Sequence, residues 1–217
     1  MVASARLRPS CSGASYEEAE RLIRGRLIPG SLVSRRFRFI DEDDRLTPPM
    51  TDHAYLPAWM YIGRAFRPRS VVEYGCGLAL ASGSVALGHP PSSVLAIQDD
   101  AGEDYNWRLA QNNLRDQVDG SVVIHTGPFD GDDFQEDLHG GLWDMAIVNE
   151  GEGEYSKILY VIQSLYSRLS PGGVLAVDFV SERDAPARRA FEEFCLSQSM
   201  EPAVLPTRYG VGMFAER

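Results

Sequence analysis

The chain has 217 residues, 44% of them hydrophobic, so it is long enough for one well-buried domain and too short for two of ordinary size. A formal net charge of −10 argues against the broad basic surface of a nucleic-acid-binding protein, and no run approaches the roughly eighteen apolar residues of a membrane span. The three cysteines are widely separated and odd in number, which indicates neither a disulfide framework nor a zinc site and fits a cytoplasmic location.

The first 53 residues are expected to form an extension in two parts. Residues 1–14 carry arginines, several serines and no acid, which is more typical of a disordered tail than of an organellar transit segment. Residues 15–53 are expected to hold a helix followed by a lid or loop. Ser15 and Glu18 have the spacing of a capping box, which predicts a helix from about Tyr16 to Arg26.

From residue 54 to 217 the chain alternates between helical and strand patterns. A helix from Ala54 has an apolar face of Tyr55, Trp59 and Ile62. Strands are expected at 70–74, 93–98, 121–126, 143–148 and 174–180, with helices ending near 87, at about 103–115 and 154–169, and starting near 181 or 184. Only a loop is expected at 127–131. Short strands at about 203–206 and 211–215 lie too close for a crossover helix and predict an antiparallel hairpin.

The turn after the first strand of this region is the most informative stretch. A β-branched run ends in an acid and is followed by Gly75 and Gly77, and then by a helical pattern. Glycine allows positive φ and lets backbone N–H groups approach a ligand, so a nucleotide-binding turn is expected. A dinucleotide fingerprint would need glycine where the chain has Leu80, which counts against NAD. On this stretch alone, a tight turn in another α/β protein stays an alternative.

Three motifs in chain order carry a resemblance to a known superfamily. Glu73, Gly75 and Gly77, with Ala79 in place of a last glycine, resemble motif I of the class I S-adenosylmethionine (SAM) dependent methyltransferases. The runs LWDMAIVN and LSPGGVLAVD, which follow later, look like motifs of small-molecule and sugar O-methyltransferases in that superfamily. The resemblance implies an α/β, Rossmann-like, doubly wound seven-stranded sheet, in the order 3-2-1-4-5-7-6, with a C-terminal antiparallel hairpin.

The resemblance also implies SAM as the cofactor and a methyltransferase reaction on a small molecule, with a hydroxyl as the expected acceptor. The amino-acid end of SAM would lie over the glycine turn, and its ribose near the end of the second strand, where the family has an acid and this chain has an amide. The loop after the third strand would face the adenine. The implied cofactor-binding residues are Glu73, Gly75, Cys76, Gly77, Gln98, Asp99, Phe129, Asp130 and Asn149.

No metal is expected. Metal-dependent members of the superfamily have an aspartate after strand four, and an acid followed by Asn after strand five. This chain has Asn149 at the first place and Asp178 followed by Phe179 at the second. One carboxylate and one amide make a poor cage for Mg²⁺.

Three side chains are candidates for the base that takes the proton of the acceptor hydroxyl. His53 precedes the first helix, where this fold places part of its lid, and Asp178 and Glu150 lie at the carboxyl edge of the sheet, where open α/β folds bind ligands. We favour His53 slightly, because an acid that closes strand five also orients loops. His125, near the end of strand three, is expected to be structural.

The expected partners are a small-molecule substrate, with no nucleic acid and no membrane, and a homodimer is left open. Departures at Ala79, Gln98 and Asn149 support an alternative, a catalytically silent protein that uses the fold as a binding or scaffolding subunit. A nucleotide-binding oxidoreductase is a third interpretation, disfavoured by Leu80 and by the terminal hairpin.

Overall fold

Short apolar and β-branched runs form the strands of one central sheet. The computed structural model describes residues 7–25, 28, 32–33, 35–37, 55–99, 104–150, 153–181 and 185–215. The parallel strands are β2 (Ser70–Tyr74), β3 (Ser93–Gln98), β4 (Ser121–Thr126), β5 (Trp143–Val148) and β6 (Leu169–Val177). The hairpin is formed by β8 (Ala203–Leu205) and β9 (Val211–Ala215). The near-continuous apolar pattern of β2, β3 and β5 is that of strands covered on both faces.

The seven strands are hydrogen-bonded in the order β4-β3-β2-β5-β6-β9-β8, in which β9 is antiparallel to both of its neighbours. Numbered along the chain from β2, this order reads 3-2-1-4-5-7-6. The mostly parallel sheet with its C-terminal antiparallel hairpin confirms the predicted fold class. Since β2, β3, β5 and β6 are parallel, their carboxyl ends meet at one edge. The strand order switches between the neighbours β2 and β5, because β3 and β4 are added on one side of β2 while β5 and β6 are added on the other.

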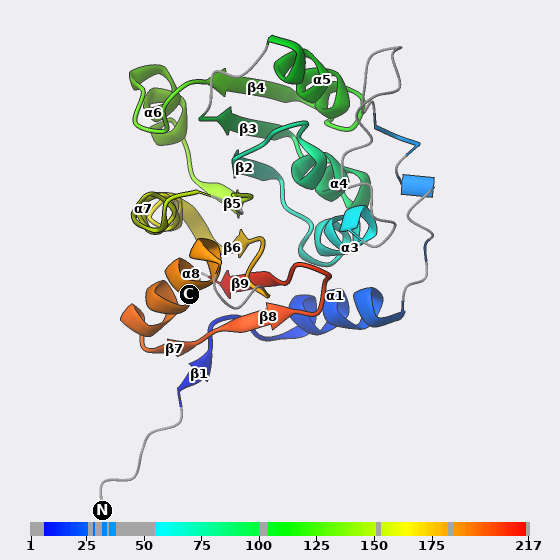
Figure 1. Ribbon diagram of the computed structural model, residues 1–217. Coiled ribbons are helices and arrows are strands. Elements are labelled where there is room, and N and C mark those ends of the chain that lie inside the picture. Colours follow the sequence, from blue (N-terminus) through cyan, green and yellow to red (C-terminus); the bar gives the residue numbers. More distant parts are fainter. Residues whose placement is uncertain are drawn as a thin grey trace, which may run out of the picture.

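Helices cover both faces of this sheet (Figure 1). On one face lie α3 (Tyr55–Phe66), α4 (Leu80–Gly88) and α5 (Asp104–Arg115), and on the other α6 (Asp132–His139), α7 (Tyr155–Tyr166) and α8 (Pro186–Ser197). Each face has its own hydrophobic core. Helix α1 (Ala14–Gly25) packs beside α3, and none of the helices in the described ranges is long and apolar enough to cross a membrane.

Helix α6 was not foreseen: a loop was expected at 127–131, where the structure has one, and no element was expected between that loop and the strand at 143. Asp132 and Asp133 lie in its first turn, where the helix dipole stabilises negatively charged side chains. Phe134 and Leu138, four residues apart, are both buried. A short helix was therefore indicated by the sequence, although its eight residues give a weak periodic signal.

The expectation of a disordered tail over residues 1–14 is wrong for residues 8 to 14. Strand β1 (Arg8–Pro9) pairs in parallel with β7 (Met200–Glu201). The buried Ser10 hydroxyl donates to Met213 O at 2.7 Å and accepts from Ala203 N–H at 2.8 Å. This small polar side chain joins strands that are distant in sequence, a contact that local composition does not reveal. Residues 1–6 and 38–54, the latter holding most of the expected lid, lie outside the described residues.

Two glycines let α3 and α4 cross at backbone contact. A Cβ on Gly88 would lie 2.0 Å from Met60 O, and a Cβ on Gly63 would lie 2.1 Å from Val85 O. These close approaches fix α3 against α4. The first turn of α3, with Tyr55 and Trp59, is thereby fixed over the sheet.

We predict that Gly88→Ala lowers the free energy of unfolding by about 1–3 kcal/mol, because the added methyl group collides with the Met60 carbonyl and forces the helices apart. The matched control is Gly141→Ala, since a Cβ on Gly141 meets nothing within 4 Å. Urea denaturation of both variants measures the difference. Equal stability of the two variants would contradict the close helix crossing.

Candidate functional site

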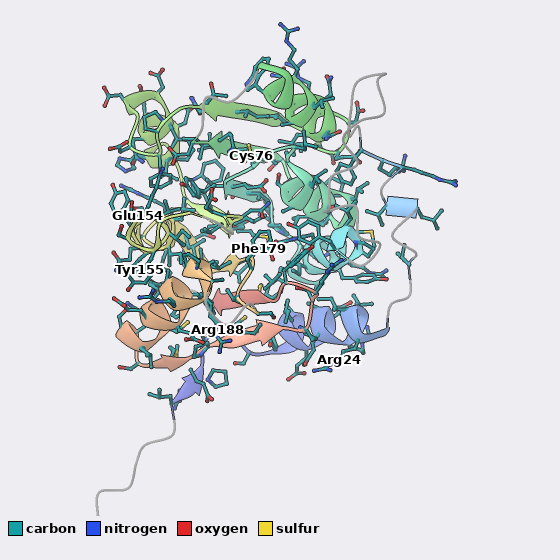
Figure 2. The ribbon with its side chains drawn as sticks, viewed as in Figure 1. Arg24, Cys76, Glu154, Tyr155, Phe179 and Arg188 are labelled. Carbon is teal, nitrogen blue, oxygen red and sulfur yellow. The ribbon has the colours of Figure 1, made fainter. Side chains whose placement is uncertain are left out.

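The turn after β2 uses glycine for two separate reasons. Gly75 has φ of +75°, and a Cβ there would lie 2.4 Å from Asn149 O, so the turn passes directly against the end of β5. Gly77 has φ of +49°, and a Cβ there would meet nothing within 4 Å. Ala79, which stands in the place of a third glycine, also has a left-handed backbone, with φ of +55°. Cys76, labelled in Figure 2, is buried between the two glycines. The turn is thus anchored at Gly75 and open at Gly77.

The residue at the end of β3 completes this turn. Gly77 N–H donates to Gln98 Oε1 at 2.7 Å, while the N–H groups of Gly75 and Cys76 donate to Ile97 O at 2.9 and 3.2 Å. The side-chain oxygen of Gln98 is therefore an acceptor for the turn, and its amide nitrogen is a hydrogen-bond donor at the position where the superfamily has an acid.

Asp99, the other candidate for the ribose contact, is held by groups on the opposite face of the sheet. Its carboxylate accepts from Tyr74 OH at 2.9 Å and from Phe129 N–H at 3.1 Å, and it forms an ion pair with Lys157 of α7. Successive residues of a strand point to opposite faces, which separates Gln98 from Asp99. Of the two, the structure therefore brings Gln98 to the glycine turn.

Glu73, the acid at the end of β2, is fully buried and holds the start of α4. Its Oε2 accepts from Ser82 N–H at 3.3 Å, in the first turn of the helix, where Ala79 offers no side-chain cap. Its Oε1 accepts from Asn149 Nδ2 at 3.4 Å. Burial raises the pKa of Glu73 to about 7, while hydrogen bonds from Ser82 and Asn149 lower it. The carboxyl joins the turn, the helix and the end of β5.

Tyr55 connects this group to Asp178, which follows β6. The Tyr55 hydroxyl donates to Asp178 Oδ2 at 2.7 Å and lies 3.4 Å from Asn149 Oδ1. Phe179 N–H donates to Asp178 Oδ1 at 2.8 Å. We name the four side chains Glu73, Asn149, Tyr55 and Asp178 the edge network. It runs along the carboxyl ends of β2, β5 and β6, from the glycine turn to the hairpin side of the sheet.

Burial sets the protonation of the edge network. It raises the pKa of Asp178 to about 6, and hydrogen bonds from Tyr55 and the Phe179 N–H oppose this rise. The Trp59 indole also lowers this pKa, although its N–H completes no hydrogen bond of good geometry among the described residues. The pKa of Tyr55 is raised well above its usual value, first by burial and then by the nearby Asp178. The phenol is thus held in its neutral form, whereas the Asp178 carboxyl gains and loses its proton close to neutral pH.

Tyr55 is the residue of this site that sequence reasoning missed, because it was counted only as part of an apolar helix face. The available signal was a hydroxyl at the first position of an otherwise apolar helix, where a buried phenol needs a partner.

The remaining predicted residues lie at different distances from the edge network. Glu150 is beside the glycine turn, since its Cβ is 3.6 Å from the place of a Cβ on Gly75. Phe129 is buried, with its ring packed edge-on against Tyr74, and Asp130 is exposed. The adenine contact of this loop stays a prediction. His53 lies outside the described residues.

Two further expectations concern histidine and metal. His125 Nε2 lies 2.8 Å from Asp137 Oδ2 of α6, and its ring packs against Phe134, which is a structural role. Within the part of the chain that the structure describes, no three His, Cys, Asp or Glu side chains gather as a metal-ligating group. Asp178 and Asn149, the two positions on which the expectation about metal rests, both face the Tyr55 hydroxyl.

No family model matches the chain, and no curated protein matches it. Its structure is similar to that of an O-methyltransferase of tomaymycin synthesis from Streptomyces achromogenes in complex with SAM, at 16% identity and a TM-score of 0.56, over 95% of this chain and 92% of that one. It is also similar to an O-methyltransferase from Bacillus cereus in complex with S-adenosylhomocysteine (SAH), at 13% identity and a TM-score of 0.56, over 95% and 92%. A SAH-bound methyltransferase from Podospora anserina matches at 14% identity and a TM-score of 0.56, over 95% and 89%. The likeness shows that this chain has the class I fold of SAM-dependent methyltransferases.

The raised pKa of Glu73 predicts a pH-dependent stability. The folded state binds this proton more tightly than the unfolded state, so its contribution is present below the ordinary pKa of 4.5 and is lost as the pH rises through about 7. Glu73→Gln should remove this loss. Relative to the wild type, the variant should gain about 2–4 kcal/mol of unfolding free energy between pH 4 and pH 8.

Denaturant titrations of both proteins at several pH values measure this difference. Glu17→Gln, on an exposed position of α1, is the control and should keep the wild-type slope. A Glu73→Gln variant whose stability runs parallel to the wild type across this range would contradict the protonation that we assign to the edge network.

Proposed function

We propose that this chain is a SAM-dependent methyltransferase that methylates a hydroxyl group of a small molecule without a metal ion. The observation that carries the proposal is the edge network, which joins a glycine turn to a buried carboxyl of raised pKa within a class I fold. The same proposal includes a cytoplasmic location and a small-molecule substrate as the partner, with neither nucleic acid nor membrane. A homodimer is left open.

The residues around the glycine turn fit the amino-acid end and the ribose of SAM. A side chain on Gly77 would project into open space, and Glu73 binds the first turn of α4, directly after the glycine turn. Gln98 presents an amide donor beside the turn, suited to a ribose oxygen. Cys76 lies in the turn and the Asn149 carbonyl lies against Gly75, so both stay candidates for the cofactor site, while Asp99, Phe129 and Asp130 define the side on which the adenine would lie. When bound, SAM supplies a methyl group that its sulfonium centre already activates.

What the protein must add is a place for the acceptor and a group that takes its proton. Asp178 meets the second need, because burial keeps its pKa at about 6, close to a neutral working pH. The Tyr55 hydroxyl shields this carboxyl and is positioned to pass a proton to it. We therefore place Asp178 first among the candidate bases. His53 and Glu150 are the other two.

One observation favours the alternative of a catalytically silent binding or scaffolding subunit. The backbone N–H groups of Gly75, Cys76 and Gly77 already have acceptors inside the protein, and Gln98 supplies one of them. A turn satisfied in this way could persist without a ligand. Tight SAH binding, together with no methyl transfer from labelled SAM to any compound of a broad hydroxyl panel, would favour this alternative.

Gly77→Ala should lower the affinity for SAH at least tenfold, because its methyl group enters the open space over the turn. The matched control is Gly172→Ala. Gly172 also has a left-handed backbone, with φ of +82°, and a Cβ there also meets nothing within 4 Å. Both variants carry a similar backbone strain, but only Gly77 lies at the proposed site. Calorimetry with SAH measures both affinities, and equal binding by the two variants would contradict the assignment of SAM as the cofactor.

Asp178→Asn should lower the rate of methyl transfer by about a hundredfold or more, and Tyr55→Phe should move the pH profile of the rate. The base acts when deprotonated, so the rate rises with pH through its pKa. Loss of the Tyr55 hydrogen bond, which lowers the pKa of Asp178, should shift this rise to higher pH. Tyr61→Phe on the same helix is the control, since its hydroxyl accepts from Ile28 N–H instead.

The assay follows labelled methyl transfer from SAM to the best acceptor of the panel, in the presence of EDTA. Wild-type turnover that disappears with EDTA and returns with Mg²⁺ would contradict metal independence. An unchanged rate in Asp178→Asn would remove Asp178 as the base and leave His53 and Glu150.

A further inference from the structure

The three tryptophans of the chain differ in how their indole N–H groups are used. Trp107 Nε1–H donates to Ile124 O at 3.4 Å, and Trp143 Nε1–H donates to Leu138 O at 3.3 Å. Trp59 is fully buried, yet its indole N–H has no hydrogen-bond partner among the described residues. A buried donor without an acceptor is unfavourable, so a native structure that keeps one calls for an explanation.

The unpartnered indole lies beside the edge network. Trp59 follows Tyr55 by one turn of α3, so the two side chains share a face of the helix, and their rings lie 6.4 Å apart in an edge contact. The Tyr55 hydroxyl donates to Asp178 Oδ2 at 2.7 Å. The indole N–H interacts with both groups, since it lowers the pKa of Tyr55 and that of Asp178. The unused donor therefore faces the candidate base.

The Asp178 carboxyl has room for a further donor. Its Oδ2 accepts from Tyr55 and its Oδ1 from Phe179 N–H, whereas an ionised carboxylate offers about four acceptor positions. Hydrogen bonds to a charged acceptor are shorter and stronger than those to a neutral one. An indole N–H that completes no bond thus lies next to an acceptor whose strength changes with its proton.

We propose that Trp59 is a positioning residue for Asp178: its indole N–H donates to the carboxylate when the carboxyl loses its proton, and the bond is lost when the proton returns. The proton leaves the carboxyl and the indole keeps its own, so no further reactant is required. A third donor stabilises the charged form and fixes the direction in which the carboxylate points. The role in methyl transfer rests on the proposed function, whereas the contact itself does not.

The other ionisable groups around this contact come from β2, α3 and the turn between β8 and β9. Glu73 interacts electrostatically with both Tyr55 and Asp178. The Tyr209 ring lies 6.0 Å from the Tyr55 ring, and the Arg208 guanidinium lies 5.2 Å from the centre of the Tyr209 ring. Glu73 has a pKa of about 7, close to the value of about 6 for Asp178, so the test must separate these two carboxyls.

NMR of the indole N–H groups in the full chain, without ligand, tests the contact directly. We expect the Trp59 indole proton to move downfield as the pH rises through about 6, because the charged acceptor strengthens the bond. The indole protons of Trp107 and Trp143 should stay in place, since their acceptors are backbone carbonyls. Asp178→Asn should remove the movement, and Glu73→Gln should keep it.

Three results would overturn the contact. They are a Trp59 indole proton that stays in place on both sides of pH 6, one that still moves in Asp178→Asn, and one that no longer moves in Glu73→Gln. If Asp178→Asn does not fold, Glu73→Gln decides: movement that persists there supports the contact, and movement that is lost assigns the titration to Glu73. Trp59→Phe identifies the resonance.

The positioning role has its own measurement, the pH profile of methyl transfer. Trp59→Phe should shift the rise of the rate to higher pH by about one unit, because Asp178 loses a donor that stabilises its charged form. Trp143→Phe is the matched control. It also removes a buried indole, but at the amino end of β5, and should keep the wild-type profile. A purely structural loss lowers the rate without moving the profile, and thermal melting verifies that both variants are folded.

The outcomes distinguish this inference from the proposed function. If the Trp59 resonance titrates as expected but the wild type methylates no compound of the hydroxyl panel, the proposed function is overturned while the contact stands. If the wild type transfers methyl groups and Trp59→Phe keeps its pH profile, the positioning role is overturned while the proposed function stands.

Discussion

The arrangement at the carboxyl edge of the sheet depends on one buried carboxyl, that of Glu73. Glu73 lies near the carboxyl end of β2, which pairs with β3 on one side and with β5 on the other. Its carboxyl accepts hydrogen bonds from the first turn of α4 and from Asn149, which follows β5. A carboxylate near a helix N-terminus is favoured by the helix dipole, whereas burial disfavours its charge. Burial raises its pKa to about 7, while the hydrogen bonds from Ser82 and Asn149 lower it. Without it, the start of α4 would have no side-chain cap, because Ala79 supplies none.

The second constraint is the close crossing of α3 and α4. Gly63 and Gly88 allow each helix to reach the backbone of the other, and this fixes the first turn of α3 over the strand ends. Tyr55 is placed there and completes the path from Glu73 to Asp178. The position of one hydroxyl thus depends on two glycines that are far from it in sequence, one of which belongs to the helix that Glu73 caps.

Local sequence pattern was sufficient for most of the fold and insufficient for contacts that join distant segments. The strands of the main sheet and the hairpin followed from apolar runs and from the short spacing between 206 and 211, although the strand expected at 174–180 runs from Leu169 to Val177. The tail prediction failed because Ser10 is ordered by Met213 and Ala203, which no local composition reveals.

The candidate site shows the same division. Gly75, Gly77 and Glu73 were identified by their spacing in one turn, and the structure brings them together with Gln98 and Asn149. Which of Gln98 and Asp99 faces the turn could not be predicted, because a shift of one residue at the end of a strand reverses the face. Tyr55 was missed because its partner lies 123 residues away.

The neutral hydrogen-bond donors around Asp178 have a consequence for the chemistry of its carboxyl. A divalent cation would hold this carboxyl ionised and make it a poor proton acceptor, because an opposite charge favours the charged form. Among the described residues, its two oxygens accept hydrogen bonds from the Tyr55 hydroxyl and the Phe179 N–H, neither of which carries charge. Burial then prevails and raises the pKa to about 6. With neutral donors around it, Asp178 is a carboxyl that can accept a proton near neutral pH, which suits the metal-independent transfer that we propose.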